Sequence, residues 1–273
     1  MVKLTNLFYK PHALQLKYHL SKARFRTVPT GRQFGKTTMC VNEAVKNVTE
    51  DIDGKIDTAL AWWVAPYFYQ CNIAYDIMTR QFRNIIRSQK MNPMVIEFNN
   101  GSKIEFRSVG NKPRSLVGPS INNLFVDECG IIPRIAIYES LLPTLTVTNG
   151  RATFMGVPKG KDWFHDMYLL GLDTSQPEFE SFHFSTYDNP YANIELINLL
   201  KNQMSEKTFR QEYLAEFKKF TGLIYKDFSR EIHLIDPFNI PVGWDRYRAM
   251  DFGATNPTCC LWITLDKDRN VYI

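Results

Sequence analysis

The sequence predicts an α/β protein in which a mainly parallel, twisted sheet is flanked by helices. Short apolar segments alternate with segments of helical periodicity, a pattern typical of parallel strands joined by crossover helices. A glycine-containing loop, residues 30–37, stands between a predicted strand and a predicted helix. Another apolar strand, residues 123–126, ends in two adjacent carboxylates. Strand-forming residues near the end of the chain predict an additional short β-rich fragment.

The composition is that of a globular protein. The chain has 273 residues, of which 44% are hydrophobic, and a formal net charge of +5. This mild basic excess permits nucleic-acid contact without requiring it. The sequence has no apolar run approaching the roughly 18 residues of a membrane span, so no membrane partner is expected. Five scattered cysteines without zinc-ligand spacing indicate reduced thiols in a cytosolic compartment.

The first elements surround the glycine-containing loop. Residues 26–28 form a short strand that leads into this loop. Residues 37–48 then continue as a helix, because their apolar side chains recur at helical spacing. Residues 59–65 form a second strand, and their nearly continuous apolar character predicts burial on both faces. Pro66 ends that strand.

The middle of the chain predicts a long helix, a hairpin and the strand that carries the acids. Residues 67–88 are predicted to be helical. Two apolar segments, residues 94–98 and 103–107, flank the turn sequence 99–101, which is a strong hairpin signal. Residues 123–126 form the next strand.

The last part of the main domain continues the alternation. Residues 152–156 predict another buried strand, and residues 179–184 predict one more. Residues 193–203 and 206–217 are predicted to be helices.

A change of character after Phe220 predicts a domain boundary. We expect a main domain over residues 1–220, a linker over residues 221–242 and the start of a second domain over residues 243–273. The strands expected in this last part are residues 247–253, 259–265 and 271–273. About thirty residues cannot bury a core of their own, so the second domain is expected to be incomplete.

The loop at residues 30–37 matches the phosphate-binding pattern Gly-x-x-x-x-Gly-Lys-Thr, except that Thr30 stands at the first glycine position. In such a loop, successive backbone N–H groups and the lysine surround a triphosphate, and the following hydroxyl can ligate Mg²⁺. We therefore expect Lys36 to bind the β- and γ-phosphates of ATP and Thr37 to bind its Mg²⁺. The alternative is an ordinary glycine-containing turn before a helix.

The other loop residues complete the expected nucleotide-binding set. Backbone donors are expected from Gly31, Gln33, Phe34 and Gly35, supported by the N-terminus of the following helix. The remaining members of the set are Thr30, Arg32 and Thr38.

Asp127 and Glu128 follow the strand at residues 123–126. A carboxylate beside an apolar strand is costly unless a metal ion or a partner compensates it. In a nucleotide site of this kind the aspartate holds Mg²⁺ and the adjacent glutamate polarises the attacking water. The pair therefore favours hydrolysis of ATP over transfer of the phosphoryl group. Two solvated acids at the start of a loop are the alternative.

Two arginines are candidates for stabilising the transferred phosphoryl group. Arg32 lies in the loop and could act as an arginine finger in cis, or could pair with a neighbouring acid. Arg134 lies just past the acidic pair and could reach the nucleotide of a neighbouring subunit, although an ordinary surface arginine is the simpler interpretation.

Taken in order, these segments resemble the large subunit of the terminases, the motors that package double-stranded DNA in tailed bacteriophages. The segments that carry the resemblance are residues 11–15, 30–37, 64–70, 103–108, 115–118, 153–164, 186–191 and 209–217. The resemblance implies a P-loop NTPase of the additional-strand type. It also implies that Gln15 reads adenine, and that Thr153, Gly156 and Pro158 belong to a motif that couples loss of the γ-phosphate to movement. Val157 stands where the family often has threonine.

The resemblance further implies the partners. They are double-stranded DNA, the portal protein and procapsid, the small terminase subunit, and other copies of the same chain in a ring, all in the host cell cytoplasm. DNA would be held by its backbone phosphates, because a packaging motor must be indifferent to sequence. Candidate basic side chains are Arg80, Arg83, Arg87, Lys218 and Lys219, which a solvated helix face explains equally well.

The family also has a carboxy-terminal nuclease domain of ribonuclease-H-like fold that cuts DNA with two metal ions. Residues 250–253 resemble its first strand, so Asp251 is expected to be the first metal ligand. Asp266 and Asp268 fall in a predicted turn and are expected to be solvated. Because the other acids would lie beyond Ile273, the chain is expected not to cut DNA by itself.

Two alternatives remain on sequence grounds. Another P-loop translocase, such as a helicase, would share the loop and the acidic pair but would separate strands. A nucleotide-switched docking adaptor would bind ATP without turnover, and the presence of Asp127 and Glu128 argues against it.

Overall fold

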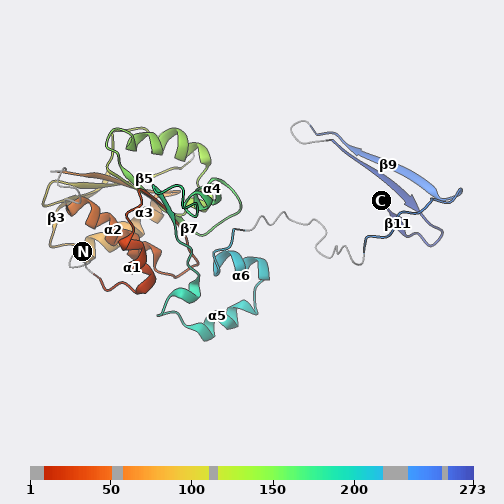
Figure 1. The fold of residues 1–273 in the computed structure, drawn as a ribbon, viewed down its shortest axis with the longest axis horizontal. Coiled ribbons are helices and arrows are strands. Elements are labelled where there is room, and N and C mark those ends of the chain that lie inside the picture. Colours follow the sequence, from red (N-terminus) through yellow and green to blue (C-terminus); the bar gives the residue numbers. More distant parts are fainter. Residues whose placement is uncertain (1–8, 51–57, 111–115, 218–232, 254–257) are drawn as a thin grey trace. The chain divides into compact units, whose positions relative to one another are not determined.

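The computed structural model describes residues 9–50, 58–110, 116–217, 233–253 and 258–273 (Figure 1). The chain divides into two compact units, Met1–Phe220 and Thr221–Ile273. Among the described residues, no helix combines the length and apolar character that crossing a membrane requires.

The first unit is built from a sheet and helices on both of its faces. Its strands are β1 (Phe25–Pro29), β2 (Leu60–Ala65), β3 (Ile86–Met91), β4 (Met94–Phe98), β5 (Lys103–Ser108), β6 (Asn123–Val126), β7 (Arg151–Gly156) and β8 (Phe179–Ser181). Its α-helices are α1 (Ala13–Leu20), α2 (Lys36–Thr49), α3 (Phe68–Gln81), α4 (Trp163–Leu170), α5 (Ile194–Lys201) and α6 (Glu206–Glu212). Shorter helical segments are η3 (Cys129–Ile131), η4 (Ala136–Leu141), η5 (Leu142–Leu145) and η6 (Thr186–Asp188).

The sheet has eight strands in the order β3-β4-β5-β2-β6-β7-β1-β8. Neighbours from β5 to β8 are parallel, and the β3-β4-β5 end is antiparallel. Strand β7 lies between β1, which precedes the glycine-containing loop, and β6, which carries the acids. This inserted strand defines the additional-strand type, so the predicted fold class is confirmed.

Two apolar layers cover the two faces of the sheet. Side chains of α2 and α3 form one core with alternate residues of the strands. The segment η4–η5 and α4 form the other core, and Figure 1 shows them opposite α1 and α2. Adjacent tryptophans of β2 illustrate the alternation, because Trp63 packs in the first core and Trp62 in the second. Burial on both faces explains the continuous apolar character of this strand.

Two predicted helices are wrong in extent. The helix expected over residues 67–88 ends at Gln81, and residues 86–91 form the edge strand β3 instead. Antiparallel pairing with β4 decides this conformation, because β3 is mostly exposed and has no apolar stripe that would hold a helix on the core. The helix expected over residues 206–217 ends at Glu212. Helices α1 and α4 were not predicted.

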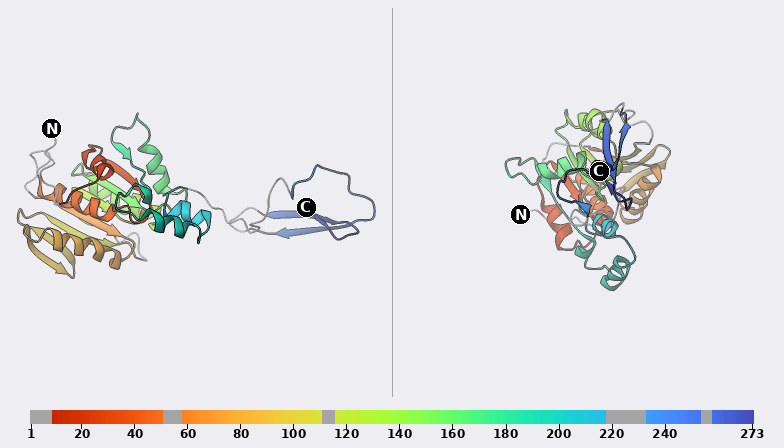
Figure 2. Two further views of the ribbon diagram at one scale, coloured as in Figure 1. Left: turned by 90° about the horizontal axis from the view of Figure 1, so that it is seen from below. Right: turned by 90° about the vertical axis from the view of Figure 1, so that its right-hand side faces the viewer.

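The second unit contains a three-stranded antiparallel sheet. Its strands are β9 (Asp245–Asp251), β10 (Cys259–Leu265) and β11 (Val271–Tyr272), in the order β11-β10-β9. Figure 2 shows the two longer strands of this sheet as blue arrows. The predicted β-rich fragment is therefore confirmed, while residues 221–232 of the predicted linker, together with Lys218 and Lys219, lie outside the described residues.

Candidate nucleotide-binding site

The glycine-containing loop connects the carboxyl end of β1 to the amino end of α2. Its backbone makes two left-handed turns, at Gln33 (φ 59°) and at Gly35 (φ 99°). Gly35 is the N-cap of α2, so Lys36 is the first helical residue. The first N–H groups of a helix have no partner within the helix, and they create a site for an anion. The described contacts assign no acceptor to the amides of Gly35, Lys36 and Thr37.

The structure brings Lys36 together with both acids of β6. Its Nζ donates to Oε1 of Glu128 at 2.7 Å and lies 3.6 Å from Oδ1 of Asp127. The acids are held in place because the amide of Asp127 donates to the Val64 carbonyl at 2.8 Å, which continues the pairing of β6 with β2. The two halves of the predicted site therefore meet at the carboxyl edge of the sheet, where parallel α/β sheets bind ligands.

The electrostatics of this cluster favour a cation beside the acids. Asp127 is 5% exposed, and burial raises the pKa of its carboxyl group, while Lys36 opposes that shift. Burial lowers the pKa of Lys36, but Asp127 and Glu128 outweigh burial and raise it above its usual value. A carboxylate that depends on positive charge in this way suits a divalent cation. Thr37, the predicted second ligand, follows Lys36 in the first turn of α2, and its metal role stays a prediction.

Glu128 adopts a left-handed backbone conformation (φ 53°, ψ 44°), which is uncommon for a residue other than glycine. Such strained conformations occur often at functional sites. Gly156 at the end of β7 makes room for this turn, since a Cβ atom there would lie 2.8 Å from the amide of Cys129 and 3.1 Å from Cα of Glu128. Of the predicted coupling residues, Gly156 thus contacts the acidic turn directly.

Part of the loop already donates its amides within the protein. Gly31 donates to the Phe184 carbonyl at 2.8 Å, and Phe34 donates to the Gly31 carbonyl at 3.4 Å. The prediction that these two amides face a phosphate is therefore not met in this structure. A Cβ atom on Gly31 would lie 2.2 Å from the carbonyl oxygen of Tyr213, so this glycine permits close packing of a distant segment. Thr30 is fully buried, and its hydroxyl has no hydrogen-bond partner among the described residues.

The two candidate arginines both pair with acids. Nε of Arg32 donates to Oε2 of Glu212 at 2.5 Å, although 63% of the arginine side chain is exposed. Arg134 lies 3.3 Å from Asp166 and stacks over the ring of Tyr138. Neither guanidinium faces the cluster formed by Lys36 in this structure, and Arg134 has the surroundings of a surface arginine.

Gln15 lies against the glycine-containing loop. Its amide oxygen accepts from the backbone N–H of His12 at 3.2 Å, and its amide nitrogen donates to the Gly35 carbonyl at 3.4 Å. The His12 ring packs edge-on against Phe34 at 5.1 Å. The start of α1 and its N-cap His12 are therefore positioned beside the loop by contacts with the loop itself.

A buried polar network joins β1, α1 and α2, and it was not predicted. Arg26 of β1 donates to Glu43 of α2 at 2.7 Å, and His19 of α1 lies 2.6 Å from the same carboxylate. Burial raises the pKa of Glu43, but Arg26 and His19 outweigh it and lower the pKa to about 2. The signal available in the sequence was a charged residue on an otherwise apolar strand and another on an apolar helix face.

The other predicted coupling residues occupy different surroundings. The hydroxyl group of Thr153 lies in the middle of β7, 2.9 Å from that of Tyr18. Pro158 is buried just after β7. The structure thus connects this strand to α1 as well as to the acidic turn.

Asp251 lies at the end of β9 in the second unit, where it is exposed and faces Cys259 across the strand pair. No cluster of three or more His, Cys, Asp or Glu side chains suited to a metal ion occurs among the described residues. The role of Asp251 therefore stays a prediction.

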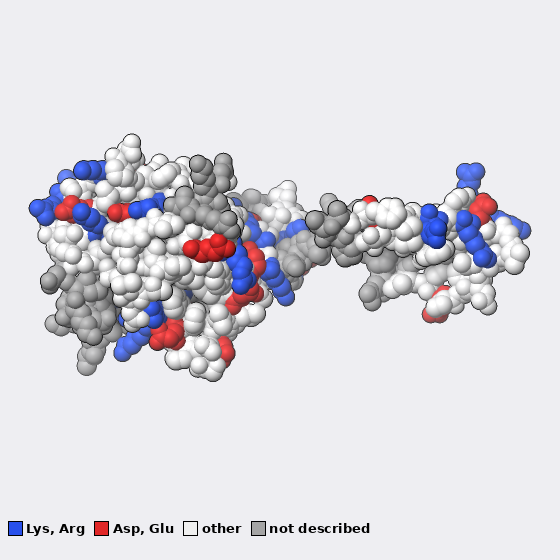
Figure 3. All heavy atoms as spheres, turned by 90° about the horizontal axis from the view of Figure 1, so that it is seen from above, with Lys and Arg blue, Asp and Glu red and all other residues white. Residues whose placement is uncertain are grey.

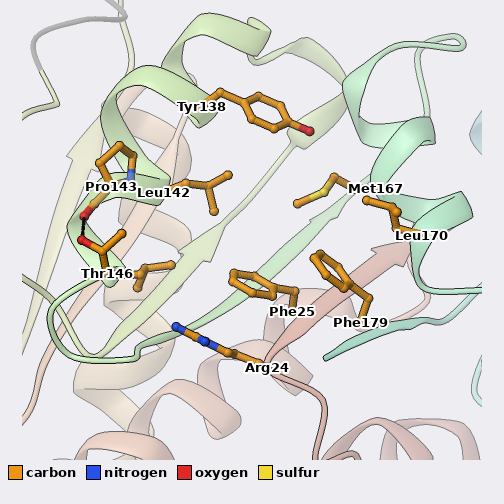
Figure 4. Close-up of a pocket in the computed structure, with 10 residues that line it drawn as sticks. Arg24, Phe25, Tyr138, Leu142, Pro143, Thr146, Met167, Leu170 and Phe179 are labelled. Carbon is orange, nitrogen blue, oxygen red and sulfur yellow. Dashed lines mark hydrogen bonds between the residues drawn. The ribbon is translucent and has the colours of Figure 1, made fainter. Parts of the chain in front are cut away.

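A separate apolar cavity of about 460 Å³ lies at the opposite end of β1 from the loop (Figure 4). Phe25 and Phe179 stack at 5.0 Å on one side of it, and Met167 and Leu170 of α4 line the other side (Figure 4). None of the predicted nucleotide-site residues lines this cavity.

Comparison with protein families matches residues 29–232 to the family described as "Terminase large subunit, T4likevirus-type, N-terminal". The large terminase subunit of Escherichia phage T5 is 30% identical over 224 residues, which are 77% of this chain and 50% of that protein. The chain spans about half the length of the curated relatives it matches.

Solved structures show the same fold. The ATPase domain of the large terminase of Thermus phage P74-26 superimposes with a TM-score of 0.66 at 26% identity, over 77% of this chain and 95% of that chain. The large terminase of another thermophilic bacteriophage, in complex with ATP-gamma-S, gives a TM-score of 0.53 at 16% identity, over 89% of this chain and 59% of that chain.

Proposed function

Because the chain belongs to the family of terminase large subunits and matches its N-terminal part, we propose that the first unit binds ATP with Mg²⁺ and hydrolyses it. One observation supports this proposal most strongly. Lys36 of the phosphate-binding loop lies 2.7 Å from Glu128 and 3.6 Å from Asp127, although the loop and the acids are far apart in the sequence.

Each residue of this cluster has a separate role in the proposed reaction. Lys36 moves from the acids to the β- and γ-phosphates, joined by the free amides at the start of α2. Asp127 and Thr37 supply oxygen ligands for Mg²⁺, which would neutralise charge on the phosphates when bound. Glu128 orients the attacking water and accepts its proton, and its strained turn fixes the direction of the carboxylate.

We extend the proposal to the base of the nucleotide and to the transferred group. Gln15 lies beside the loop and is proposed to read adenine after exchanging its contact with Gly35. Arg32 is proposed to stabilise the γ-phosphoryl group, which requires it to leave Glu212. The complex of the thermophilic phage's large terminase with ATP-gamma-S supports a triphosphate as the ligand.

The intact protein is proposed to use this hydrolysis to move double-stranded DNA into a procapsid, in a ring of subunits on the portal and with the small terminase subunit. The main domain, the linker and the segment that resembles the start of a nuclease domain keep the proposed boundaries of residues 1–220, 221–242 and 243–273. In the view of Figure 3, basic and acidic side chains are interspersed, and Arg87 lies 3.5 Å from Glu97. The distribution of charged side chains therefore does not identify a surface that binds DNA.

The test is ATP turnover by the 273-residue chain with and without double-stranded DNA. We expect Lys36→Ala to abolish phosphate release and to weaken ATP binding, because the lysine contacts the phosphates in both ground and transition states. Arg87→Ala, on the edge strand, is the control and should hydrolyse ATP normally without DNA. Turnover by Lys36→Ala at the rate of the unaltered chain would refute the proposed function.

A further inference from the structure

The end of the sheet away from the glycine-containing loop contains a cavity that the proposed function does not use. It is the apolar cavity of about 460 Å³ at the start of β1 (Figure 4). Sites for small organic ligands are concave, about 300–1,000 Å³ in volume and mostly apolar, with a few polar groups that orient the ligand. The volume of this cavity lies within that range, and its lining has the same character.

The apolar walls of the cavity are fixed by the fold. The rings of Phe25 in β1 and Phe179 in β8 stack with their centroids 5.0 Å apart and their planes 22° apart. Leu142 of η5 and Met167 of α4 line the opposite wall (Figure 4). All four side chains pack in or against the apolar core that includes η4, η5 and α4. The cavity is therefore preformed, and a ligand does not have to reorder these side chains on binding.

The rim of the cavity is open to solvent. Leu170 of α4 and Tyr138 of η4 both line the cavity, and they are 38% and 36% exposed. A ligand can therefore reach the apolar walls from this rim. Contact with the apolar part of a ligand would remove exposed apolar surface from water, which favours binding.

The guanidinium of Arg24 lies at the edge of this apolar lining (Figure 4). Its Nε donates to the Gly150 carbonyl at 2.9 Å, which holds the side chain in place. Among the described residues its terminal nitrogens donate no hydrogen bond, and its ion pair with Glu178 spans 4.0 Å. The Glu178 side chain is 62% exposed, so this ion pair is weak. The terminal nitrogens therefore remain as donors for an anion.

The other polar groups of the lining carry no charge. Figure 4 shows Tyr138 on the opposite side of the cavity from Arg24, with apolar side chains between them. Burial raises the pKa of Tyr138, although the Arg134 guanidinium over its ring opposes this shift, so the phenol is neutral near pH 7. A ligand that matches this lining has one anionic end and an apolar body. Inorganic phosphate, which is polar throughout, would leave the apolar walls without a partner.

We propose that this cavity binds an amphiphilic organic anion, a compound with an apolar body and one carboxylate or sulfonate group. The apolar body contacts the stacked rings of Phe25 and Phe179, and the anionic group accepts hydrogen bonds from the terminal nitrogens of Arg24. Binding here does not depend on the proposed ATPase activity, because none of the predicted nucleotide-site residues lines the cavity.

The test measures the binding of two fluorescent probes to the 273-residue chain. Anilinonaphthalene sulfonate has an apolar body and a sulfonate, and phenylnaphthylamine has the same body without the charge. Arg24→Gln should weaken binding of the sulfonate about threefold or more and leave the affinity for the uncharged probe unchanged, because only the sulfonate loses a charged donor. Leu170→Trp should weaken binding of both probes about tenfold or more, because the larger side chain fills the cavity.

Two matched controls separate the cavity from the rest of the surface. Leu169 is on the same helix as Leu170 and is 50% exposed, but it does not line the cavity, so Leu169→Trp should bind both probes as the unaltered chain does. Arg87→Gln removes another arginine with a weak ion pair, at the far edge of the sheet, and should also change neither affinity. Thermal unfolding establishes that each variant is folded, and Arg24→Gln keeps the test valid if Leu170→Trp does not fold.

Three results would overturn this assignment. One is that the unaltered chain binds neither probe. The second is that Arg24→Gln binds the sulfonate as tightly as the unaltered chain, or that a folded Leu170→Trp binds both probes as tightly. The third is displacement of the sulfonate by ATP-γ-S in Mg²⁺, which would place the probe in the nucleotide site. Failure of the chain to bind ATP-γ-S would instead refute the proposed function and leave the cavity site standing.

Discussion

At the scale of single residues, each cation of the candidate site forms an ion pair with a carboxylate of the protein. Lys36 pairs with Asp127 and Glu128, while Arg32 and Lys159 both pair with Glu212. A nucleotide must therefore exchange existing ion pairs. This explains why residues that are expected to contact phosphate point toward carboxylates in this structure.

The roles of Lys36, Asp127 and Glu128 could be proposed from the sequence because short motifs carry them. The contact between Arg32 and Glu212 could not be predicted, because the two residues are 180 positions apart and the contact depends on where α6 ends. The same holds for Gly31, whose lack of a side chain serves the packing of Tyr213 rather than a phosphate. Such contacts depend on tertiary packing, and short sequence motifs carry no information about it.

The buried Glu43 predicts a specific pH dependence of stability. Its pKa is lowered from 4.5 to about 2 in the folded protein, so its contribution is present above pH 4.5 and is lost as the pH falls toward 2. The shift corresponds to roughly 3 kcal/mol. We expect Glu43→Gln to be less stable than the unaltered chain near neutral pH, because Arg26 then loses its charged partner. Urea denaturation at several pH values measures both effects.

Whether Glu43 causes this pH dependence is tested by the change in unfolding free energy between about pH 5.5 and about pH 3. The unaltered chain should lose more stability over this range than Glu43→Gln, which lacks the titrating group. Equal losses in the two proteins would mean that Glu43 is not responsible.

At the scale of elements, the strands were predicted better than the helices. Strand β2 was recognisable because burial on both faces requires a continuous apolar segment, and the β4–β5 hairpin because of its turn residues. Strand β3 was mistaken for helix because its residues are polar and its conformation is decided by pairing at the sheet edge. Helix α6 ends at Glu212, whose carbonyl accepts from the Arg32 amide of the loop instead of from a further helical turn.

The end of β7 offers a test of how closely this strand must approach the acidic turn. Gly156 (φ 157°) and Gly160 (φ 152°) have similar backbone conformations, but a Cβ atom would meet the backbone of Glu128 and Cys129 only at Gly156. We expect Gly156→Ala to lower the free energy of unfolding by about 1–3 kcal/mol more than Gly160→Ala does, because backbone atoms must move. Denaturant unfolding of the two variants compares them directly.

Displacement of Glu128 should also slow ATP hydrolysis by Gly156→Ala, whereas Gly160→Ala should retain turnover. Equal stability and turnover of the two variants would show that the approach of β7 to Glu128 is not required.

At the scale of the whole molecule, the mainly parallel sheet could be predicted from the sequence pattern and its additional-strand type from the resemblance, whereas the contacts between distant segments could not. Alternating strands and helices predicted the parallel sheet, and its strand order places β7 between β1 and β6 as the additional-strand type requires. The packing of residues 184–216 against the glycine-containing loop joins elements distant in sequence, and so does the network of Arg26, Glu43 and His19. Only the folded chain defines them.

The first unit therefore brings the glycine-containing loop and the acidic pair together at one edge of the sheet, and residues 184–216 pack against the loop. If this arrangement hydrolyses ATP, removing the proposed general base must stop hydrolysis while the contacts that bind ATP stay in place. Glu128→Gln preserves the shape of the side chain and a hydrogen-bond acceptor for Lys36, but it removes the carboxylate that activates water.

The most direct test is a single-turnover measurement of phosphate release by Glu128→Gln, with ATP binding measured on the same sample. We predict ATP affinity within a few-fold of the unaltered chain and a hydrolysis rate at least about 100-fold lower, the lower end of what a general base contributes. A hydrolysis rate equal to that of the unaltered chain, with ATP bound, would contradict the assignment of Glu128 and the site built around it.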